Sequence, residues 1–320
     1  MSATEAYDDA RESPFGVMEP PPRDCPLDAG IVGRVLREQF PAMPFRSIER
    51  LGSGWERDVF LVDGEVAVHF PRYAGVADGL DRHAAILELV AGNVGPTVVV
   101  PEITLWGKAG RHYPHRFFGH APIPGVEADP LERPDSPELA FQLGATLSEI
   151  HAIPTSAAER IGIVDAPGSL EADLATLVGQ AEQVGALRKV APLAFGWLRD
   201  GPHVPEEYPG PPRFLHGDLQ PEHIIVMPVS KRLSGIIDWS GAALGDPALD
   251  FSYLLVLHGR KFLERALAAY RLPLDEAFLE RTAFRGRVRA LGWLVYALFL
   301  GMDLRRVRQE VDNAFSLAPA

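Results

Sequence analysis

Residues 214–226 read Phe-Leu-His-Gly-Asp-Leu-Gln-Pro-Glu-His-Ile-Ile-Val, the most informative part of the sequence. A second apolar run, Gly235-Ile236-Ile237, follows after a short turn and ends on Asp238. The two runs predict two strands joined by a tight turn, so that His223 and Asp238 lie at neighbouring strand ends. Asp218 is then expected on the loop just before them.

The carboxylates of Asp218 and Asp238 and the imidazole of His223 suit one kind of chemistry. Phosphoryl transfer needs a base that orients the attacking hydroxyl and ligands that hold Mg²⁺ on the phosphates. Mg²⁺ prefers hard oxygen ligands, so Asp238 fits directly, whereas the imidazole of His223 favours softer metals. His223 has two other open roles, acting through a water molecule or binding a phosphate oxygen.

Together with Gly245-Asp246-Pro247-Ala248-Leu249-Asp250, these motifs resemble the aminoglycoside phosphotransferase superfamily. That superfamily includes the macrolide phosphotransferases and is distantly related to protein kinases. Its members carry His-Gly-Asp, an Asn or His five residues after the Asp, a hydrophobic-Ile-Asp-Trp segment, and Gly-Asp-Pro with an Asp shortly after. His223 at the metal position is similar to the macrolide and 2''-aminoglycoside branches, and Ile237-Asp238-Trp239-Ser240 is similar to the macrolide branch.

The resemblance implies a role for each residue of the motif. Asp218 is the catalytic base, and His223 and Asp238 hold Mg²⁺. Asp250 braces the catalytic loop by accepting backbone hydrogen bonds, and His216 supports the same loop. The implied co-substrate is ATP or GTP, and the implied acceptor is a hydroxyl of a macrolide or aminoglycoside, although the sequence does not identify the residues that bind the acceptor.

The rest of the chain divides into a strand-rich and a helix-rich part. Two β-rich runs around Asp63-Gly64 predict a hairpin, and the apolar spacing over 78–91 predicts a helix. A second strand pair is predicted at 98–106 and 116–118. Long helices are predicted over 137–152, 168–184, 264–271 and 275–300.

This arrangement predicts an α+β fold, and the resemblance specifies a protein-kinase-like fold with two lobes around a cleft. We expect a flexible arm at 1–28, a small β-rich, nucleotide-binding N-lobe at 29–121, and a larger, mostly helical C-lobe at 122–320. The C-lobe is expected to carry the catalytic loop, the metal site and the acceptor pocket.

The expected phosphate grip in the N-lobe departs from the family pattern. Ser53 and Gly54 belong to a turn that resembles the phosphate-covering turn, where glycine lets backbone amides approach phosphate oxygens. Relatives carry Lys or Arg at the position of His69 and Glu at that of His83. Because a neutral imidazole has no fixed charge at pH 7, the grip is predicted to be weak or pH-dependent. With a small shift of register, the charged candidates are Arg72, Arg82 and Glu88.

The segment 118–125 is the predicted hinge between the lobes. The resemblance implies that the carbonyl of Ala121 and the amide of Ile123 bind the purine. Pro122 has no N–H to offer, so the hinge is expected to be stiff.

The acceptor pocket is expected between Asp218 and the C-terminal helices. Acidic candidates for binding a cationic amine are Asp275, Glu276, Asp303 and Glu310. Aromatic candidates for an apolar pocket are Trp239, Tyr253, Trp293, Tyr296 and Phe299. A solvated helix face and core packing are the simpler interpretations of these two sets.

Composition narrows the partners. The 320 residues carry a net charge of -12, which disfavours nucleic acid and suits a small, cationic acceptor. Cys25 is the only cysteine, so an internal disulfide and a cysteine-rich zinc site are excluded. The acidic and polar first residues predict no secretory signal, and the longest apolar stretch, residues 290–302, is too short to span a membrane and predicts a core helix. We expect a cytoplasmic protein, and the oligomeric state is open.

Two further functions stay open at this stage. One is a metabolite kinase that acts on an amino alcohol or a sugar. The other is a catalytically weak pseudokinase that binds ligands, as the histidines in the N-lobe suggest. The presence of Asp218, His223 and Asp238 argues against the pseudokinase, since a protein without catalysis has no chemical need for all three.

Overall fold

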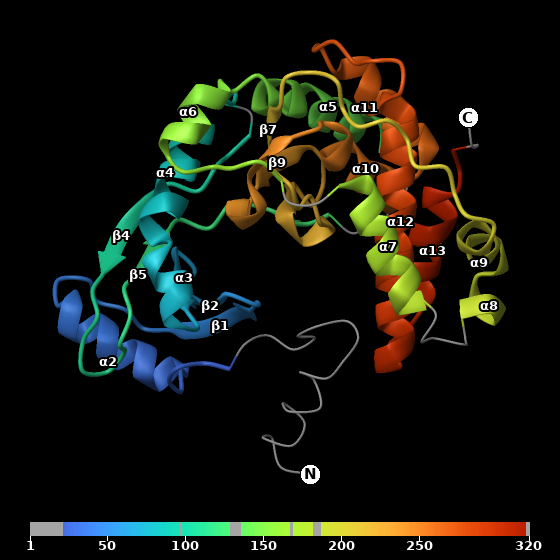
Figure 1. Ribbon diagram of the computed structural model, residues 1–320. Helices are drawn as coiled ribbons and strands as arrows, with labels where there is room; N and C mark the ends of the chain where they lie inside the picture. Colours follow the sequence, from blue (N-terminus) through green and yellow to red (C-terminus); the bar gives the residue numbers. More distant parts are fainter. Residues whose placement is uncertain (1–21, 97, 129–135, 167–168, 182–186, 318–320) are drawn as a thin grey trace. The chain divides into compact units, whose positions relative to one another are not determined.

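A computed structural model describes residues 22–96, 98–128, 136–166, 169–181 and 187–317 (Figure 1). Most of the expected N-terminal arm, residues 1–28, lies outside the described residues. The chain forms two compact units, of which the first joins Met1–Glu88 to Val100–Ile123 and the second joins Leu89–Val99 to Pro124–Ala320. The second unit thus includes residues that the sequence-based division placed in the N-lobe.

The first unit is built on an antiparallel sheet in the order β1-β2-β3-β5-β4, which confirms the expected β-rich lobe. Its strands are β1 Ile48–Ser53, β2 Arg57–Val62, β3 Val66–Pro71, β4 Ile103–Gly107 and β5 Phe117–His120. The predicted hairpin joins β2 to β3, where Asp63 and Gly64 have positive φ angles of 49° and 74°. Two left-handed residues in succession match the twist of the adjoining strands, which explains the Asp-Gly pair.

The two faces of this sheet have different surroundings. Asp58 and Phe60 are buried on the face where Phe60 joins the hydrophobic cluster that includes residues of helix α2. Val59 pairs with His69 across the ladder between β2 and β3. Because side chains alternate along a strand, Arg57 and His69 lie on the face opposite to Asp58 and Phe60.

The helices next to the sheet are α2 Ala29–Gln39, α3 Ala74–Asp78 and α4 Leu80–Ala91. The sequence analysis did not predict α2. Its N-terminus is capped by Asp28, whose carboxylate accepts a hydrogen bond of 2.7 Å from the amide of Ile31. Helix α4 begins at Leu80 rather than at residue 78, because Gly79 separates it from α3.

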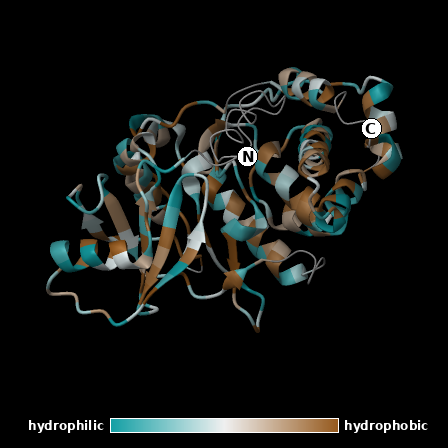
Figure 2. Ribbon diagram, turned by 90° about the horizontal axis from the view of Figure 1, so that it is seen from below, coloured by the Kyte–Doolittle hydropathy of each residue, from teal (hydrophilic) through white to brown (hydrophobic). Residues whose placement is uncertain are grey.

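The second unit is mainly helical, as predicted. Its helices are α5 Pro137–His151, α6 Thr155–Arg160, α7 Leu170–Ala181, α8 Leu187–Val190, α9 Pro192–Arg199, α10 Ala248–His258, α11 Arg260–Ala269, α12 Phe278–Leu300 and α13 Arg305–Ala314. Helices α5 and α11 lie side by side (Figure 1), and Gly144 allows this, since a Cβ there would lie 1.9 Å from the carbonyl oxygen of Ala266. Helix α12 packs against α10 and α13. Figure 2 shows both hydrophobic and hydrophilic residues along the helices, and α10 is buried on nearly all sides.

Short strands in the second unit hold the predicted catalytic loop. One sheet has the order β6-β8-β9, formed by β6 Val126–Glu127, β8 Ile224–Val226 and β9 Leu233–Ile236. A second sheet pairs β7 Arg213–Leu215 with β10 Ala243–Gly245. The 3-10 turns η1 Pro221–His223 and η2 Trp239–Gly241 flank β8 and β9. The two strands predicted from residues 214–238 are therefore β8 and β9, and they are antiparallel.

The apolar stretch 290–302 is only partly the core helix that the sequence predicted. Leu291 and Leu294 of α12 are buried, but Phe299 and Met302 are 50% and 48% exposed. Across the part of the chain that the structure describes, no helix has the length and apolar character needed to cross a membrane.

Candidate active site

Asp250, on the first turn of α10, holds the loop that carries Asp218. Its Oδ2 accepts a hydrogen bond of 2.9 Å from the amide of His216, and its Oδ1 accepts one of 2.8 Å from the amide of Gly217. His151 of α5 donates from Nε2 to Oδ2 at 3.0 Å. Burial alone would raise the pKa of Asp250, but the hydrogen bonds and the nearby histidines outweigh burial and lower it. Asp250 is thus a buried carboxylate that fixes two successive backbone amides.

His216 is enclosed within the same loop. Its Nδ1 accepts a hydrogen bond of 3.2 Å from the amide of Asp218, and its Nε2 donates to the carbonyl of Ile237 at 3.1 Å. These contacts require a neutral ring with the proton on Nε2. Burial lowers the pKa of His216, which favours the same neutral form. His216 therefore links the loop to the end of β9.

Gly217 can only be glycine in this loop. Its φ angle is +77°, and a Cβ would lie 2.2 Å from the carbonyl oxygen of Gly241. The tight approach of the two backbones sets the position of the next residue, Asp218.

Asp218 is half-exposed and contacts two side chains. Its Oδ1 lies 3.0 Å from the hydroxyl of Tyr253 on α10, and its Oδ2 lies 3.6 Å from Nδ1 of His223. The side chain is 36% exposed, so a substrate can reach it. The contact with Tyr253 has no signal in the sequence, because the two residues are 35 positions apart and follow no motif spacing.

His223 and Asp238 come together as the sequence predicted for neighbouring strand ends. Nε2 of His223 lies 3.6 Å from Oδ2 of Asp238. Nδ1 of His223 donates to the backbone carbonyl of Asp218 at 2.7 Å, since a carbonyl can only accept. The lone pair of the neutral ring is therefore on Nε2, the nitrogen that faces Asp238.

Asp238 fits a Mg²⁺ site of the kind that is completed by phosphates and water, and His223 would add a nitrogen donor, which Mg²⁺ favours less than oxygen. Mg²⁺ in phosphotransferases is commonly held by one or two carboxylates together with substrate phosphates. The described residues contain no group of three or more His, Cys, Asp or Glu side chains that would form a closed metal site. One carboxylate oxygen and one unprotonated nitrogen that face each other are consistent with the smaller protein contribution.

Asp238 has an unusual backbone conformation. Its φ and ψ angles are 58° and 68°, in the left-handed region that non-glycine residues seldom adopt. Its Oδ1 accepts a hydrogen bond of 2.9 Å from the hydroxyl of Ser240. Strained residues of this kind concentrate at functional sites.

In the first unit, the predicted phosphate-covering turn is held by arginines. The hydroxyl of Ser53 accepts hydrogen bonds from Arg23 at 2.9 Å and from Arg72 at 3.2 Å. Arg72 also donates to the carbonyl of Gly54 at 3.1 Å. No neighbouring atom lies close to a Cβ built on Gly54 except the carbonyl oxygen of Arg57 at 3.7 Å, so a ligand has room to approach this backbone.

His69 and His83 gather on one aromatic ring, Phe118. The ring centroids of His69 and Phe118 are 4.7 Å apart and those of His83 and Phe118 are 5.3 Å apart. His120 stacks on His69 at 4.7 Å. Burial lowers the pKa of His69 well below its ordinary value, and the charges of neighbouring groups add to this effect. His69 is thus neutral at pH 7 and cannot supply the fixed positive charge that a Lys or Arg supplies.

The cation nearest in register to His69 is Arg57, which the sequence analysis did not consider. Arg57 shares the sheet face of His69, and its guanidinium lies over the Phe118 ring at 5.7 Å. Arg57 Nη2 lies 3.2 Å from the carboxylate of Glu56, while its buried Nε has no hydrogen-bond partner among the described residues. Arg72, proposed as a substitute from the sequence, lies instead with Asp58 and Phe60, on the other face.

At the predicted hinge, the carbonyl of Ala121 already has one partner. Nδ1 of His120 lies 2.8 Å from it and donates to it. A carbonyl oxygen has two lone pairs, so Ala121 can still accept a second hydrogen bond. Ile123 is the last residue of the first unit.

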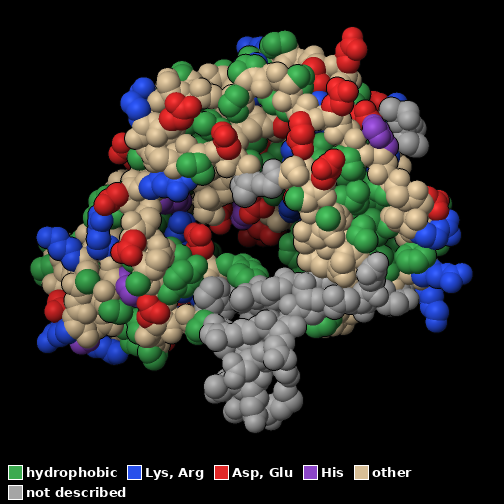
Figure 3. Space-filling model, in the orientation of Figure 1, with side chains coloured by type: hydrophobic (Ala, Val, Ile, Leu, Met, Phe, Trp, Pro, Cys, Tyr) green, Lys and Arg blue, Asp and Glu red, His purple; other side chains and the backbone are tan. Residues whose placement is uncertain are grey.

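Most acidic candidates for a cationic acceptor are balanced within the chain. Asp275, Asp303 and Glu310 form ion pairs with Arg281, Arg305 and Arg306 at 2.6, 2.6 and 3.0 Å. Figure 3 shows that acidic and basic side chains both occur over the face drawn. Among the aromatic candidates, Trp239 is buried against His216, and Trp293 is 38% exposed. Tyr253 is the aromatic candidate that contacts Asp218.

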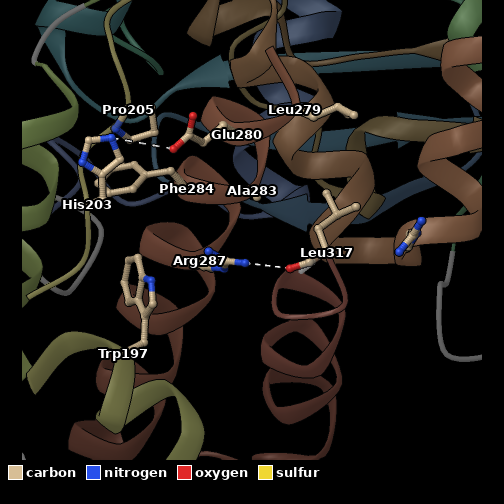
Figure 4. A pocket seen from close by; sticks show the side chains of 10 residues that line it. Trp197, His203, Pro205, Leu279, Glu280, Ala283, Phe284, Arg287 and Leu317 are labelled. Carbon is tan, nitrogen blue, oxygen red and sulfur yellow. Dashed lines mark hydrogen bonds and ion pairs between the residues drawn. The ribbon is translucent and has the colours of Figure 1, made fainter. Parts of the chain in front are cut away.

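A separate hollow of about 360 Å³ lies in the second unit, close to α9 and α12 (Figure 4). Trp197 and Phe284 line it, and Arg287 donates to the carbonyl of Leu317 at 2.7 Å (Figure 4). Neither Asp218 nor the candidate metal ligands line this hollow, so it is not the predicted catalytic site.

Comparison with known proteins gives concordant results. A family model for the phosphotransferase enzyme family matches residues 47–285. Viomycin phosphotransferase of Streptomyces vinaceus is 27% identical over 217 residues, which cover 65% of this chain and 73% of that protein. The uncharacterized protein YcbJ of Bacillus subtilis (strain 168) is 29% identical over 209 residues, which cover 62% of this chain and 65% of YcbJ. The match thus spans slightly less than two thirds of the length of YcbJ.

Solved structures share the fold. The GDP and kanamycin complex of APH(2")-IIia superposes with a TM-score of 0.66 at 26% identity, covering 88% of this chain and 96% of that chain. The apoenzyme of macrolide 2'-phosphotransferase MphH from Brachybacterium faecium superposes with a TM-score of 0.59 at 23% identity, covering 92% of this chain and 99% of that chain. These matches confirm the predicted kinase-like fold and the resemblance found in the sequence.

Proposed function

The chain belongs to the phosphotransferase enzyme family, and from that premise we propose that it transfers the γ-phosphoryl group of ATP or GTP to a hydroxyl group of an antibiotic-like small molecule. The observation that carries this proposal is the position of His223. One of its ring nitrogens lies 3.6 Å from the carboxylate of Asp218 and the other lies 3.6 Å from the carboxylate of Asp238. The proposed base and the two proposed metal ligands therefore adjoin each other, with Asp218 and His223 on one loop and Asp238 at the end of β9.

In the proposed reaction, Asp218 orients the acceptor hydroxyl and takes its proton. The hydroxyl oxygen forms a bond to the γ-phosphorus, and the bond between that phosphorus and the oxygen of the β-phosphate breaks, which releases the nucleoside diphosphate. His223 and Asp238 would hold Mg²⁺, which neutralises phosphate charge when it is bound. Asp250 and His216 keep the loop in position and do not touch the reacting atoms.

Nucleotide contacts are proposed in the first unit. The backbone of Ser53 and Gly54 would face the phosphates, and the carbonyl of Ala121 and the amide of Ile123 would bind the purine. His69 would contribute as a neutral, stacked ring and not as a cation. The relative in complex with GDP and kanamycin supports testing GTP beside ATP.

The acceptor is proposed from the relatives. A viomycin phosphotransferase, a kanamycin complex and a macrolide phosphotransferase are all similar to this chain. Macrolides and aminoglycosides are the leading candidates, and amino alcohols and sugars represent a metabolite kinase. A panel of these compounds with each nucleotide, read as a mass gain of one phosphoryl group, identifies the class. Phosphorylation of an amino alcohol or sugar alone would overturn the antibiotic proposal and retain the kinase.

The base is tested with Asp218→Asn, which keeps the size of the side chain. We expect kcat to fall about 1,000-fold, because general base catalysis contributes about 100-fold to 10,000-fold. Asp303→Asn is the matched control, since Asp303 is an exposed carboxylate that pairs with Arg305. Equal turnover by the wild type and Asp218→Asn would show that Asp218 is not the base.

The histidines around Phe118 support one other function, a pseudokinase that binds ligands with little transfer. Its sign would be nucleotide binding without turnover for any acceptor of the panel or for water. Calorimetry with a non-hydrolysable nucleotide, beside the turnover assay, separates this case from the enzyme.

A further inference from the structure

Tyr253 adds a contact to the base that neither the motif nor its spacing contains. Its hydroxyl lies 2.8 Å from the carbonyl oxygen of Gly217 and 3.0 Å from Oδ1 of Asp218. Both partners are acceptors, so the single hydroxyl proton is shared between the backbone of the loop and the carboxylate. Tyr253 thus contacts both the backbone of the loop and the side chain of Asp218.

This contact makes the two oxygens of Asp218 different. Oδ1 is occupied by Tyr253, whereas Oδ2 lies 3.6 Å from Nδ1 of His223, beyond hydrogen-bonding distance. The proton on that nitrogen is already given to the backbone carbonyl of Asp218 at 2.7 Å. Oδ2 therefore has free acceptor capacity on a side chain that is 36% exposed.

Tyr253 is itself held firmly. It is only 4% exposed, and it lies one turn after Asp250 on α10, the helix that fixes the amides of the same loop. The guanidinium of Arg289 from α12 covers its ring at 3.7 Å. Burial raises the pKa of Tyr253, Arg289 opposes this effect, and Asp218 adds to it. The phenol therefore stays protonated and remains a donor at neutral pH.

We propose that Tyr253 is a positioning residue for phosphoryl transfer, which fixes Asp218 so that Oδ2 is the oxygen that takes the proton of the acceptor hydroxyl. This inference rests on the proposed function. Without the phenol, the carboxylate can rotate and present either oxygen. Arg289 covers the ring of Tyr253 and also interacts electrostatically with Glu310 of α13.

The test is Tyr253→Phe in the full-length protein, which removes one oxygen atom. We expect kcat to fall about 10-fold to 100-fold, as for loss of a hydrogen bond to a charged group, while KM for the nucleotide changes less than about twofold. The loss should therefore appear in kcat and not in KM, which separates a positioning role from a general loss of structure. Tyr113→Phe is the matched control, since Tyr113 is also buried and donates to the backbone carbonyl of Pro71.

A second measurement separates this role from a loss of stability. Chemical denaturation of Tyr253→Phe and Tyr113→Phe should give similar losses of unfolding free energy, since each variant loses one buried hydroxyl. A wild-type kcat in Tyr253→Phe would overturn the role of Tyr253, and so would equal losses of kcat in the two tyrosine variants. If the proposed function itself is wrong, the wild type will show no turnover, which is a different result.

Discussion

The catalytic loop of the second unit and the aromatic cluster of the first unit both enclose histidines, but they treat the ring nitrogens differently. In the loop, His216 uses both nitrogens in hydrogen bonds, to the amide of Asp218 and the carbonyl of Ile237. In the cluster, Nε2 of His69 is buried and has no hydrogen-bond partner among the described residues. The rings of His69, His120 and Phe118 are instead stacked.

The difference shows which region is built to hold charge. At Asp250 two amides, and at Asp218 the hydroxyl of Tyr253, point at the carboxylates, so negative charge is stabilised beside the proposed base and metal ligands. Around His69, burial removes positive charge from the place where the family pattern has a cation. Positive charge at that sheet face is left to Arg57, whose guanidinium covers Phe118. The two regions therefore differ in polarity as well as in structure.

The largest effect is expected when Asp250, the carboxylate that holds the catalytic loop, is replaced. Asp250→Ala leaves two buried amides and His151 without their acceptor, so we expect a loss of about 4 kcal/mol of unfolding free energy and no detectable turnover. Chemical denaturation followed by circular dichroism measures the stability. The control is Asp303→Ala, an exposed carboxylate, for which less than about 1 kcal/mol is expected. A loss as small for Asp250→Ala would mean that the loop does not depend on this carboxylate.

The next prediction concerns the backbone of the loop. Gly217→Ala puts a Cβ 2.2 Å from a carbonyl oxygen at a φ angle of +77°, so we expect about 3 kcal/mol of destabilisation with loss of activity. Gly64→Ala is the matched control, since its φ angle is +74° but no atom lies within 4 Å of the added Cβ. That variant should lose about 1 kcal/mol and keep its turnover. Equal losses at the two sites would assign the cost to the φ angle alone.

The smallest effect is expected in the aromatic cluster, as a change in pH dependence. His69 has a lowered pKa in the folded chain, so the unfolded chain binds more protons as the pH falls below about 6.5. Stability from this residue is complete above that pH and declines as the pH drops towards the folded pKa, by at most about 1.4 kcal/mol per pH unit. The free energy of unfolding of His69→Phe should therefore fall less steeply than that of the wild type as the pH drops from about 6.5, the unfolded pKa, to about 5.

The control for this variant is nucleotide affinity. If His69 acts as a neutral ring, KM for the nucleotide in His69→Phe should stay within about twofold of the wild type at pH 7 and above. An increase of about tenfold at pH 7 would show that His69 carries charge or donates to the nucleotide, and would contradict the neutral cluster.

Much of the catalytic loop was predictable because its motif residues lie close together in the sequence. His-Gly-Asp, the His five residues later and the Asp at the end of β9 lie within about 25 residues, and β8 and β9 join them in a simple hairpin. The contact of Tyr253 with Asp218 depends instead on how α10 packs beneath the loop, which no spacing rule gives. The same holds for His151, which reaches Asp250 from 99 residues away.

In the first unit, the sequence predicted the strands better than it predicted which side chains lie on which face of the sheet. The hairpin at Asp63-Gly64 was recognisable from its dipeptide, and His69 and His83 do gather on one ring. Which cation accompanies them depends on strand register, because a shift of one residue moves a side chain to the other face. That is why Arg72 was considered from the sequence and Arg57 was not. Helix α2 was not predicted, although Asp28 caps its N-terminus.

The left-handed backbone of Asp238 has a consequence for any effort to engineer or evolve this protein. Replacement by glycine would relieve the conformational cost at this position, about 1 kcal/mol, and would also remove a proposed metal ligand. A library selected only for heat resistance would therefore enrich the substitution, while one selected for the proposed phosphoryl transfer would reject it. The frequency of glycine at position 238 in the two populations would measure the trade-off between stability and catalysis at this residue.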